Sequence, residues 1–439
     1  MEKRARFLGS MVLCLVAGLC ACGGRAERTA FDSPLDGPPE YPGGGGGEPA
    51  NGPSQQPSNP GYSADGSQML PAPGYRDPRS TEDPCGGPPS SLGAKLLWAQ
   101  VVPFYGMDAT PYFAFSGDGS KLITPSDEYG MDGNVTFAVA DGARITGAKA
   151  RVLGRDAAWS RELRGTDHYG PAGDVTVVEI GLEQTLLSLD SVSRLISLSA
   201  DGKYAFGVYC HDGDRLERRR ISDGESTVVP LSAELSPCTV GNSAGYLDLN
   251  APFVVTSSND SAAFLAEQGH ALVLASLSAG TTRAHAIYEA APPDASPRTD
   301  MAVELALSPS ERALATVNGA GALRIWSYPE LLQSLPEIQV SVTHAFRDCY
   351  CTPRDFAPVA WSPDERYLAT ADEADNTVLR RACDGRVITT LEAPKQASSL
   401  DGYAQGPAFI AFNPQGRGLA VLSISEVYGA TVSYYELTE

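Results

Sequence analysis

From about residue 93 onward, short apolar stretches alternate with turn residues, a pattern typical of β-strands joined by tight turns. One motif recurs seven times: an apolar residue, a small residue, an apolar residue, then Ser or Asn, as in Phe113-Ala114-Phe115-Ser116. The seven copies close at Ser116, Ser160, Ser199, Asn250, Ser308, Ser362 and Asn413. The closing residues lie between 39 positions (Ser160 to Ser199) and 58 positions (Asn250 to Ser308) apart. This recurrence predicts seven β units of one kind.

Each unit continues as an antiparallel meander. Gly117-Asp118-Gly119 is a tight-turn signal before the β-rich run 121–124. In the same unit, the runs 135–139 and 144–149 are separated by Asp141-Gly142, which predicts a third and a fourth strand. The second strand of the second unit, 161–164, is the poorest match to the pattern.

The units resemble blades of WD-repeat and related bacterial β-propellers. The closest copy is Trp361-Ser362-Pro363-Asp364-Glu365-Arg366-Tyr367-Leu368-Ala369-Thr370, and Arg324-Ile325-Trp326-Ser327 lies where a blade's Trp-Asp pair would be. This resemblance implies an all-β fold, with residues 93–439 forming a seven-bladed, WD-repeat-like β-propeller.

The last blade runs out of chain after its third strand, 431–437. The segment 95–102 precedes the first blade and has no other blade to join. We expect this N-terminal strand to complete the seventh blade and close the ring.

Loop lengths distinguish the two faces of the predicted ring. The connections between first and second strands and between third and fourth strands are short, and we call their side the short-turn face. The other connections are long: 126–133, 165–173, 290–300, 343–355 and 393–406. Long loops are often functional, so we predict that this long-loop face binds a partner. Its candidate contact residues, which as single residues could equally be ordinary solvated positions, are Tyr129, Met131, His168, Tyr169, Tyr350 and Tyr428.

Three carboxylates, Asp156, Asp248 and Glu304, are predicted to line the central channel from the first strands. Together they could hold Ca²⁺, which takes several oxygen ligands, but hydrated channel residues explain them as well. We therefore predict no metal and no cofactor.

The first residues resemble a bacterial lipoprotein signal. Lys3, Arg4 and Arg6 precede the apolar stretch 7–19, and Leu19-Cys20-Ala21-Cys22 resembles a lipobox. This resemblance implies a signal peptide of residues 1–21 and lipidation of Cys22, with Gly23 and Gly24 favouring the outer membrane. A plain secretory signal cut nearby is the alternative.

Residues 22–92 are rich in Gly and Pro and poor in large apolar residues, so we expect a disordered linker. Such a chain has a reach of roughly 45 Å, which would hold a monomeric head clear of a membrane surface. The formal net charge of −20 makes nucleic acid an unfavourable partner.

The cysteines beyond Cys22 permit disulfides in an exported protein. Their places in the predicted ring favour the pair Cys210–Cys238 and the pair Cys85–Cys383. Cys349 and Cys351 are left to bond each other, to stay reduced or to hold a metal. Free, inert thiols throughout are the alternative.

No nucleophile elbow, zinc-protease motif or phosphate-binding loop occurs in the chain. We therefore expect a non-enzymatic scaffold on the cell envelope that binds a protein or an envelope ligand. A propeller-type hydrolase or lyase with its site at the channel mouth is the alternative, and a structural envelope component is a third hypothesis.

Overall fold

A computed structural model provides the structure of the protein, and all the residues that it describes fall within Met69–Glu439. The described residues are 92–103, 112–126, 133–148, 151–165, 173–209, 213–232, 235–237, 253–265, 271–288, 302–345, 354–374, 376–391, 406–425 and 429–438. Every regular element among them is a β-strand, and none of these stretches contains a helix with the length and hydropathy needed to cross a bilayer.

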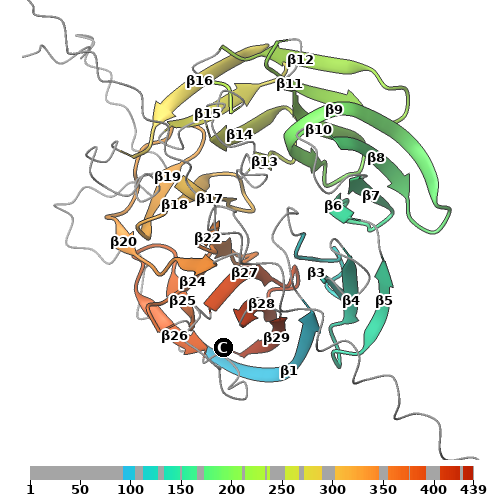
Figure 1. Cartoon of the computed structure of the whole chain (residues 1–439). Helices are drawn as coiled ribbons and strands as arrows, with labels where there is room; N and C mark the ends of the chain where they lie inside the picture. Colours follow the sequence, from blue (N-terminus) through green and yellow to red (C-terminus); the bar gives the residue numbers. More distant parts are fainter. Residues whose placement is uncertain are drawn as a thin grey trace, which may run out of the picture. The chain divides into compact units, whose positions relative to one another are not determined.

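Seven blades surround a centre, and each is an antiparallel meander of four strands (Figure 1). Blade 1 is β2 (Ala114–Phe115), β3 (Lys121–Pro125), β4 (Asn134–Ala138) and β5 (Arg144–Ala148); blade 2 is β6 (Arg151–Arg155), β7 (Arg161–Gly165), β8 (Gly173–Glu179) and the first part of β9 (Gln184–Leu198). Blade 3 is the rest of β9, β10 (Tyr204–Tyr209), β11 (Arg215–Arg220) and β12 (Ser226–Pro230); blade 4 is β13 (Phe253–Val255), β14 (Ser261–Leu265), β15 (Ala271–Ser276) and β16 (Thr281–Ala286).

The remaining blades follow the same plan. Blade 5 is β17 (Ala302–Leu307), β18 (Ala313–Asn318), β19 (Ala322–Ser327) and β20 (Ile338–Gln339); blade 6 is β23 (Ala360–Trp361), β24 (Tyr367–Ala371), β25 (Thr377–Arg381) and β26 (Val387–Leu391). Blade 7 is β27 (Gly406–Phe412), β28 (Gly418–Ser425), β29 (Gly429–Thr438) and β1 (Gly93–Pro103). The predicted all-β, seven-bladed propeller is confirmed.

Ring closure by an N-terminal strand is also confirmed. The sheet order of blade 7 is β1-β29-β28-β27, and β1 pairs with β29 from Gly93↔Thr438 to Pro103↔Gly429. In Figure 1 the blue strand β1 lies along the red strands of the chain's other end. The two ends of the propeller sequence thus share one sheet.

Two of the seven predicted first strands are wrong. In blade 2 the first strand is β6, and the segment 157–160 predicted for it forms the turn that follows. In blade 4 the first strand is β13, which closes at Thr256 rather than at Asn250. The motif required Ser or Asn at the closing position, but these blades use Asp156 and Thr256, which offer an equivalent side-chain oxygen.

Blades 2 and 3 are joined without a loop. The first part of β9 pairs with β8 as the outer strand of blade 2, and its last part pairs with β10 as the first strand of blade 3. The seven strands from β6 to β12 therefore form one continuous sheet. The expectation of a loop between every fourth strand and the next first strand fails at this junction.

Between blades 5 and 6 the chain adds a short hairpin, which we call the arm. Its stem is β21 (Thr343–Ala345) paired with β22 (Arg354–Phe356) in register Thr343↔Phe356. Phe356 is buried and meets Phe409 of blade 7 edge to face, with ring centroids 5.3 Å apart. The predicted long loop 343–355 thus has a packed base.

The core lies between blades. Six apolar clusters among the described residues each join two neighbouring blades. Two small residues of the motif, Ala306 and Ala411, pack against these clusters. Ala306 of blade 5 shares its cluster with Trp361 of blade 6, and Trp361 Nε1 donates to Ala306 O over 2.9 Å. A small residue on one blade thus leaves room for an aromatic ring on the next.

Candidate functional site

The short-turn face is built on seven equivalent turns between first and second strands. Each contains one residue in the left-handed backbone region, and the amide of that residue donates to the carbonyl of the closing residue three positions earlier. The seven left-handed residues are Gly119, Trp159, Gly202, Asn259, Glu311, Glu365 and Gly416, with φ between 54° and 72°. Since only three are Gly, four turns place a side chain in a conformation that favours Gly.

These turns are linked from blade to blade. Glu365 accepts from Ser310 of the preceding blade, through the backbone N–H and, over 2.8 Å, through the hydroxyl. Where the residue is Gly119, Asn413 of blade 7 donates to its carbonyl over 3.0 Å, across the ring closure. A chain of polar contacts therefore follows the turns and holds the blades in register on the short-turn face.

Asp156 is one of these turn residues and not a channel carboxylate, which corrects the prediction. It is buried, and its Oδ1 accepts from the backbone amides of Ser160 (2.7 Å) and Arg161 (3.1 Å). Its Oδ2 accepts from the hydroxyl of Ser160 over 2.5 Å. Its carboxylate thus accepts hydrogen bonds from donors of its own turn.

The other two predicted channel carboxylates have different outcomes. Glu304 is half-buried on β17, the first strand of its blade, and accepts from the amide of Leu305 over 3.2 Å. Asp248 lies outside the described residues, and the first strand of its blade is β13 rather than the segment that contains it. Within the described stretches, no three His, Cys, Asp or Glu side chains come together as a metal site would require.

The predicted partner-contact residues Tyr129, Met131, His168, Tyr169, Tyr350 and Tyr428 all lie outside the described residues. What the structure provides is the base of one of their loops. The stem of the arm brings Ala345 and Arg354 into register, so the segment 346–353, which contains Tyr350, starts and ends at paired strands. Binding of a partner by the long-loop face therefore remains a prediction.

Cys383 lies in the turn between β25 and β26, on the short-turn face as predicted, and it is disulfide-bonded. Its predicted partner Cys85 lies outside the described residues, as do Cys210, Cys238, Cys349 and Cys351. Which cysteine bonds Cys383 stays a prediction, and so does the second pair. Cys22 also lies outside the described residues.

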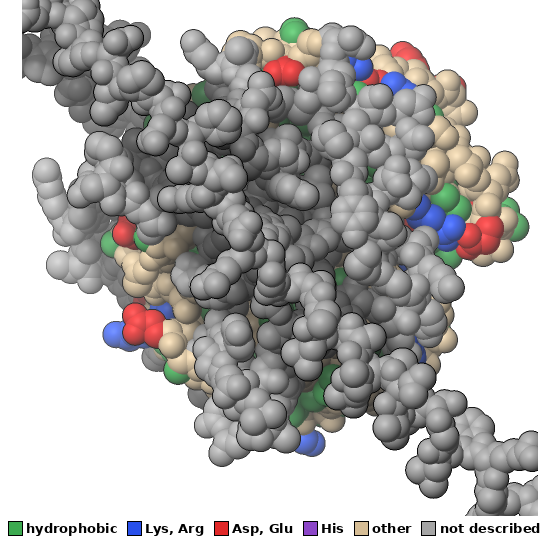
Figure 2. All heavy atoms as spheres, viewed as in Figure 1, with side chains coloured by type: hydrophobic (Ala, Val, Ile, Leu, Met, Phe, Trp, Pro, Cys, Tyr) green, Lys and Arg blue, Asp and Glu red, His purple; other side chains and the backbone are tan. Residues whose placement is uncertain are grey.

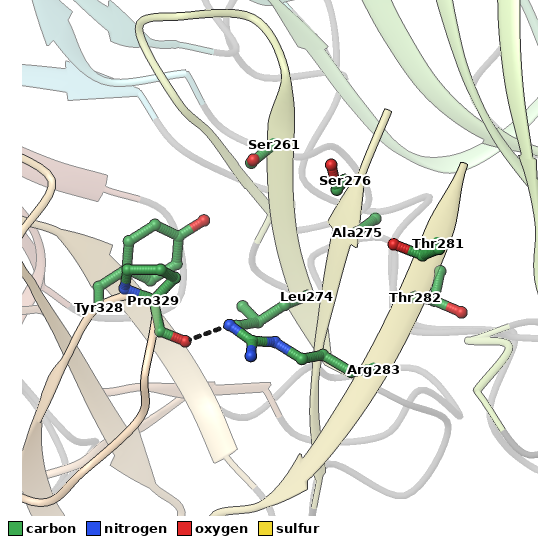
Figure 3. A pocket seen from close by; sticks show the side chains of 9 residues that line it. All are labelled: Ser261, Leu274, Ala275, Ser276, Thr281, Thr282, Arg283, Tyr328 and Pro329. Atoms are coloured by element: carbon green, nitrogen blue, oxygen red, sulfur yellow. Dashed lines mark hydrogen bonds between the residues drawn. The ribbon is translucent and has the colours of Figure 1, made fainter. Parts of the chain in front are cut away.

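A cleft of about 320 Å³ opens between blades 4 and 5, and no pattern in the sequence indicated it (Figure 3). Strand register brings its residues together. Ser261 pairs with Ser276 and Ser276 with Thr281, so three hydroxyl side chains form a row across β14, β15 and β16. Leu274 and Arg283 pair in the next row on the same face of the sheet. We call this site the interblade cleft.

Blade 5 supplies the opposite wall through Tyr328 and Pro329, which follow β19. Arg283 Nη2 donates to Pro329 O over 2.6 Å, as the dashed line in Figure 3 shows. Burial raises the pKa of Tyr328 to about 12, so its phenol stays protonated at physiological pH. Hydroxyls separated by up to 20 residues carry no sequence signature, and only the register of blade 4 could have indicated this row.

Charged side chains of both signs appear at the rim of the face in Figure 2. Ion pairs occur among the described residues: Arg164 pairs with the buried Glu162, and Arg324 with Glu337 over 2.9 Å. The rim in Figure 2 thus carries both signs of charge, although the net charge of the chain is negative.

Comparison with known proteins supports the fold. The β-propeller domain of Cps50 (Swd1) from Myceliophteria thermophila superposes with a TM-score of 0.52 at 13% sequence identity, covering 79% of this chain and 100% of that domain. No family model and no curated protein matches the sequence. With seven four-stranded blades, a ring closed by β1 and this structural likeness, the chain has a WD40-like seven-bladed β-propeller fold.

Proposed function

We propose that this chain is a binding scaffold of the bacterial cell envelope, which presents the long-loop face of its propeller to a protein or an envelope ligand. The observation that carries the proposal is the asymmetry between the two faces. Turns of one repeated geometry join the first and second strands on one face, while five connections on the other face (103–114, 230–253, 286–302, 339–360 and 391–406) are ten residues or longer. A propeller needs no such loops to close, so their length suggests a role in recognition.

The ring suits that role because it is rigid where it supports the loops. Its blades are joined by apolar clusters, by polar contacts between turns, and by the pairing of β1 with β29. A partner would meet loops held on a preorganised frame, which lowers the entropy lost on binding.

The proposal also includes a lipid anchor at Cys22 and a flexible linker to residue 92, so that the head acts at a bacterial membrane, in this proposal the outer one. Support comes from the lipobox-like Leu19-Cys20-Ala21-Cys22 and from the Gly- and Pro-rich composition that follows it. Binding rather than catalysis is proposed because the sequence contains no recognisable nucleophile or metal motif.

The arm gives a sharp test of partner binding. Replacing residues 346–353 by Asn-Gly would leave Ala345 and Arg354 paired across a two-residue turn, which keeps the stem. We expect the full-length chain to capture a specific protein or envelope component from solubilised envelope, and the shortened variant to capture less of it. The matched control is L182S, which changes a residue that is 69% exposed on the short-turn face. Equal capture by all three proteins, or none by any, would contradict the proposal.

The anchor has its own test. In a Gram-negative host supplied with labelled palmitate, the wild-type chain should become labelled and should sediment with the outer membrane. A C22A variant should remain unlabelled, because the thiol that accepts the lipid is gone. Labelling of the C22A variant, or a soluble wild-type protein without label, would contradict the anchor.

A further inference from the structure

We propose that the interblade cleft binds a carboxylate group, held by the guanidinium of Arg283 and by hydroxyls of the surrounding strands. None of these side chains lies on the long-loop face. The cleft borders two short turns, 277–280 of blade 4 and 328–331 of blade 5, so it belongs to the opposite side of the ring. Binding in this cleft is therefore independent of the partner binding proposed for the long-loop face, and the two can be tested separately.

Arg283 has donor capacity to spare. A guanidinium carries five N–H donors, and in the described part of the chain Arg283 makes one hydrogen bond, from Nη2 to the carbonyl of Pro329. No described carboxylate forms an ion pair with it, whereas Arg155, Arg164 and Arg324 each have an acidic partner. The bond to Pro329 orients the group, which lowers the cost of presenting its remaining edge to a planar anion.

The hydroxyls complete the site. In the described stretches, Ser261 Oγ, Thr281 Oγ1 and Tyr328 Oη have no hydrogen-bonding partner, although all three residues line the cleft. Tyr328 is buried to 9% exposure with its phenol protonated, so it is a donor that an acceptor in the cleft can use. Leu274, which is also buried, lines the cleft beside them and would contact the aliphatic part of a ligand.

The charge of the whole chain favours a carboxylate over a phosphate. With a formal net charge of −20, the protein's own field opposes every anion, and a doubly charged group suffers about twice the penalty of a singly charged one. Acidic groups near the cleft strengthen this argument. The negative charge of Glu311 contributes to the raised pKa of Tyr328. Asp260 accepts a hydrogen bond from the hydroxyl of Ser278 in the adjoining turn. A planar, singly charged carboxylate matches a guanidinium at the smallest cost.

The carboxylate could come from a small organic acid or from the C-terminus of a peptide, and calorimetric titration of the full-length protein separates these sources. The probes are propionate, succinate, a tri-alanine peptide with a free C-terminus, the same peptide amidated, and inorganic phosphate. We expect propionate and the free peptide to bind and the amidated peptide to fail. Tighter binding of the free peptide than of propionate would assign the site to chain ends, and the reverse to small acids.

Substitutions then place the binding in the cleft. R283Q should weaken binding by roughly ten- to a hundredfold, as loss of a charged hydrogen-bonding partner implies. R283K should fall between, because an ammonium keeps the charge but not the planar fork, and Y328F should weaken binding severalfold. The control R417Q removes another exposed arginine, in a turn of blade 7, and should change nothing.

Three results would overturn the proposal: no binding of any carboxylate, tighter binding of phosphate than of propionate, or equal losses in R283Q and R417Q. Thermal unfolding of each variant shows whether it folds. If R283Q proves unstable, Y328F and T281V test the same site from blades 5 and 4.

Discussion

Among single residues, the left-handed positions of the turns contribute most to the geometry of the ring. Trp159, Asn259, Glu311 and Glu365 occupy a conformation that costs a residue with a Cβ about 1 kcal/mol or more relative to Gly. All four contact the preceding blade: Trp159 donates from Nε1 to Phe115 O over 3.3 Å, Asn259 donates to Asp201 over 3.4 Å, and the two glutamates accept from backbone amides there. The contacts with the preceding blade thus offset the energetic cost of the left-handed backbone.

A pair of substitutions at Glu365 separates strain from contact. E365A keeps the strained backbone and loses the bonds to Ser310, so we expect the free energy of unfolding to fall by about 1–2 kcal/mol. E365G loses the same bonds but relieves the strain, so it should be nearly neutral. Urea unfolding followed by circular dichroism measures both. If E365G proved less stable than E365A, the strain at this position would be refuted.

Asp118 in the turn of blade 1 should make stability depend on pH. Hydrogen bonds from the Ser116 hydroxyl, and then from the amide and hydroxyl of Ser120, lower its pKa from 3.8 to about 2. A carboxylate with a lowered folded pKa stabilises the protein above its unfolded pKa, and this contribution is lost as the pH falls from about 4 to about 2. D118N has no titrating group there, so its midpoint of thermal unfolding should differ from the wild type at pH 5 and converge with it near pH 2. A difference that stays constant over this range would contradict the assignment.

At the scale of strands and turns, much of the propeller was predictable because its determinants are local. The turn at Asp141-Gly142 was located from the sequence alone, and Gly142 has a positive φ between the paired strands β4 and β5. The first strands of blades 2 and 4 were missed because the closing oxygen can come from Asp or Thr, and a motif built on Ser and Asn excludes both. The channel role of Asp156 failed with that assignment.

The continuous strand β9 and the interblade cleft could not be predicted for a different reason. Whether a chain runs straight from one blade into the next depends on the angle between blades, which the residues of the junction do not report. The cleft depends on which residues of three strands face blade 5, and a shift of one residue in their register would move all of them to the other face.

Trp98 on β1 connects the N-terminal strand to two blades. Its ring stacks on Tyr434 with centroids 5.6 Å apart, and its Nε1 donates to Val139 O of blade 1 over 2.8 Å. We expect W98A to lower the free energy of unfolding by about 3–5 kcal/mol, as loss of a large buried side chain does. W98F keeps the stacking and loses the hydrogen bond, so we expect it to lower the free energy of unfolding by only about 1–2 kcal/mol. Chemical denaturation compares the two, and equal losses would show that the hydrogen bond and not the ring holds β1.

For the whole molecule, the outer strand of a blade leaves one sheet edge unpaired, and in blade 7 this outer strand is β1. On β1, Val101 is 75% exposed and Leu97 is 41% exposed. The pairing with β29 shifts register between Leu96 and Trp98, and Lys95 is exposed beside this bulge. A bulge and a charge interrupt the flat edge that a second chain would need for pairing, so we expect β1 to disfavour such pairing.

Deleting residues 92–103 tests this view of the whole molecule. The deletion would expose the edge of β29, a regular strand whose Tyr434 and Tyr435 are buried in the intact ring. We expect the truncated protein to associate through that edge and to elute from a sizing column at larger mass, whereas the full-length protein elutes as a monomer. A synthetic peptide of residues 92–103 should return the truncated protein to a monomer, because it supplies the missing pairing, and the same peptide with Trp98 replaced by Ala should be less effective, because the stacking on Tyr434 is lost. A truncated protein that stays monomeric and as stable as the full chain would mean that six complete blades and a three-stranded seventh suffice, and that β1 serves some purpose other than closing the ring.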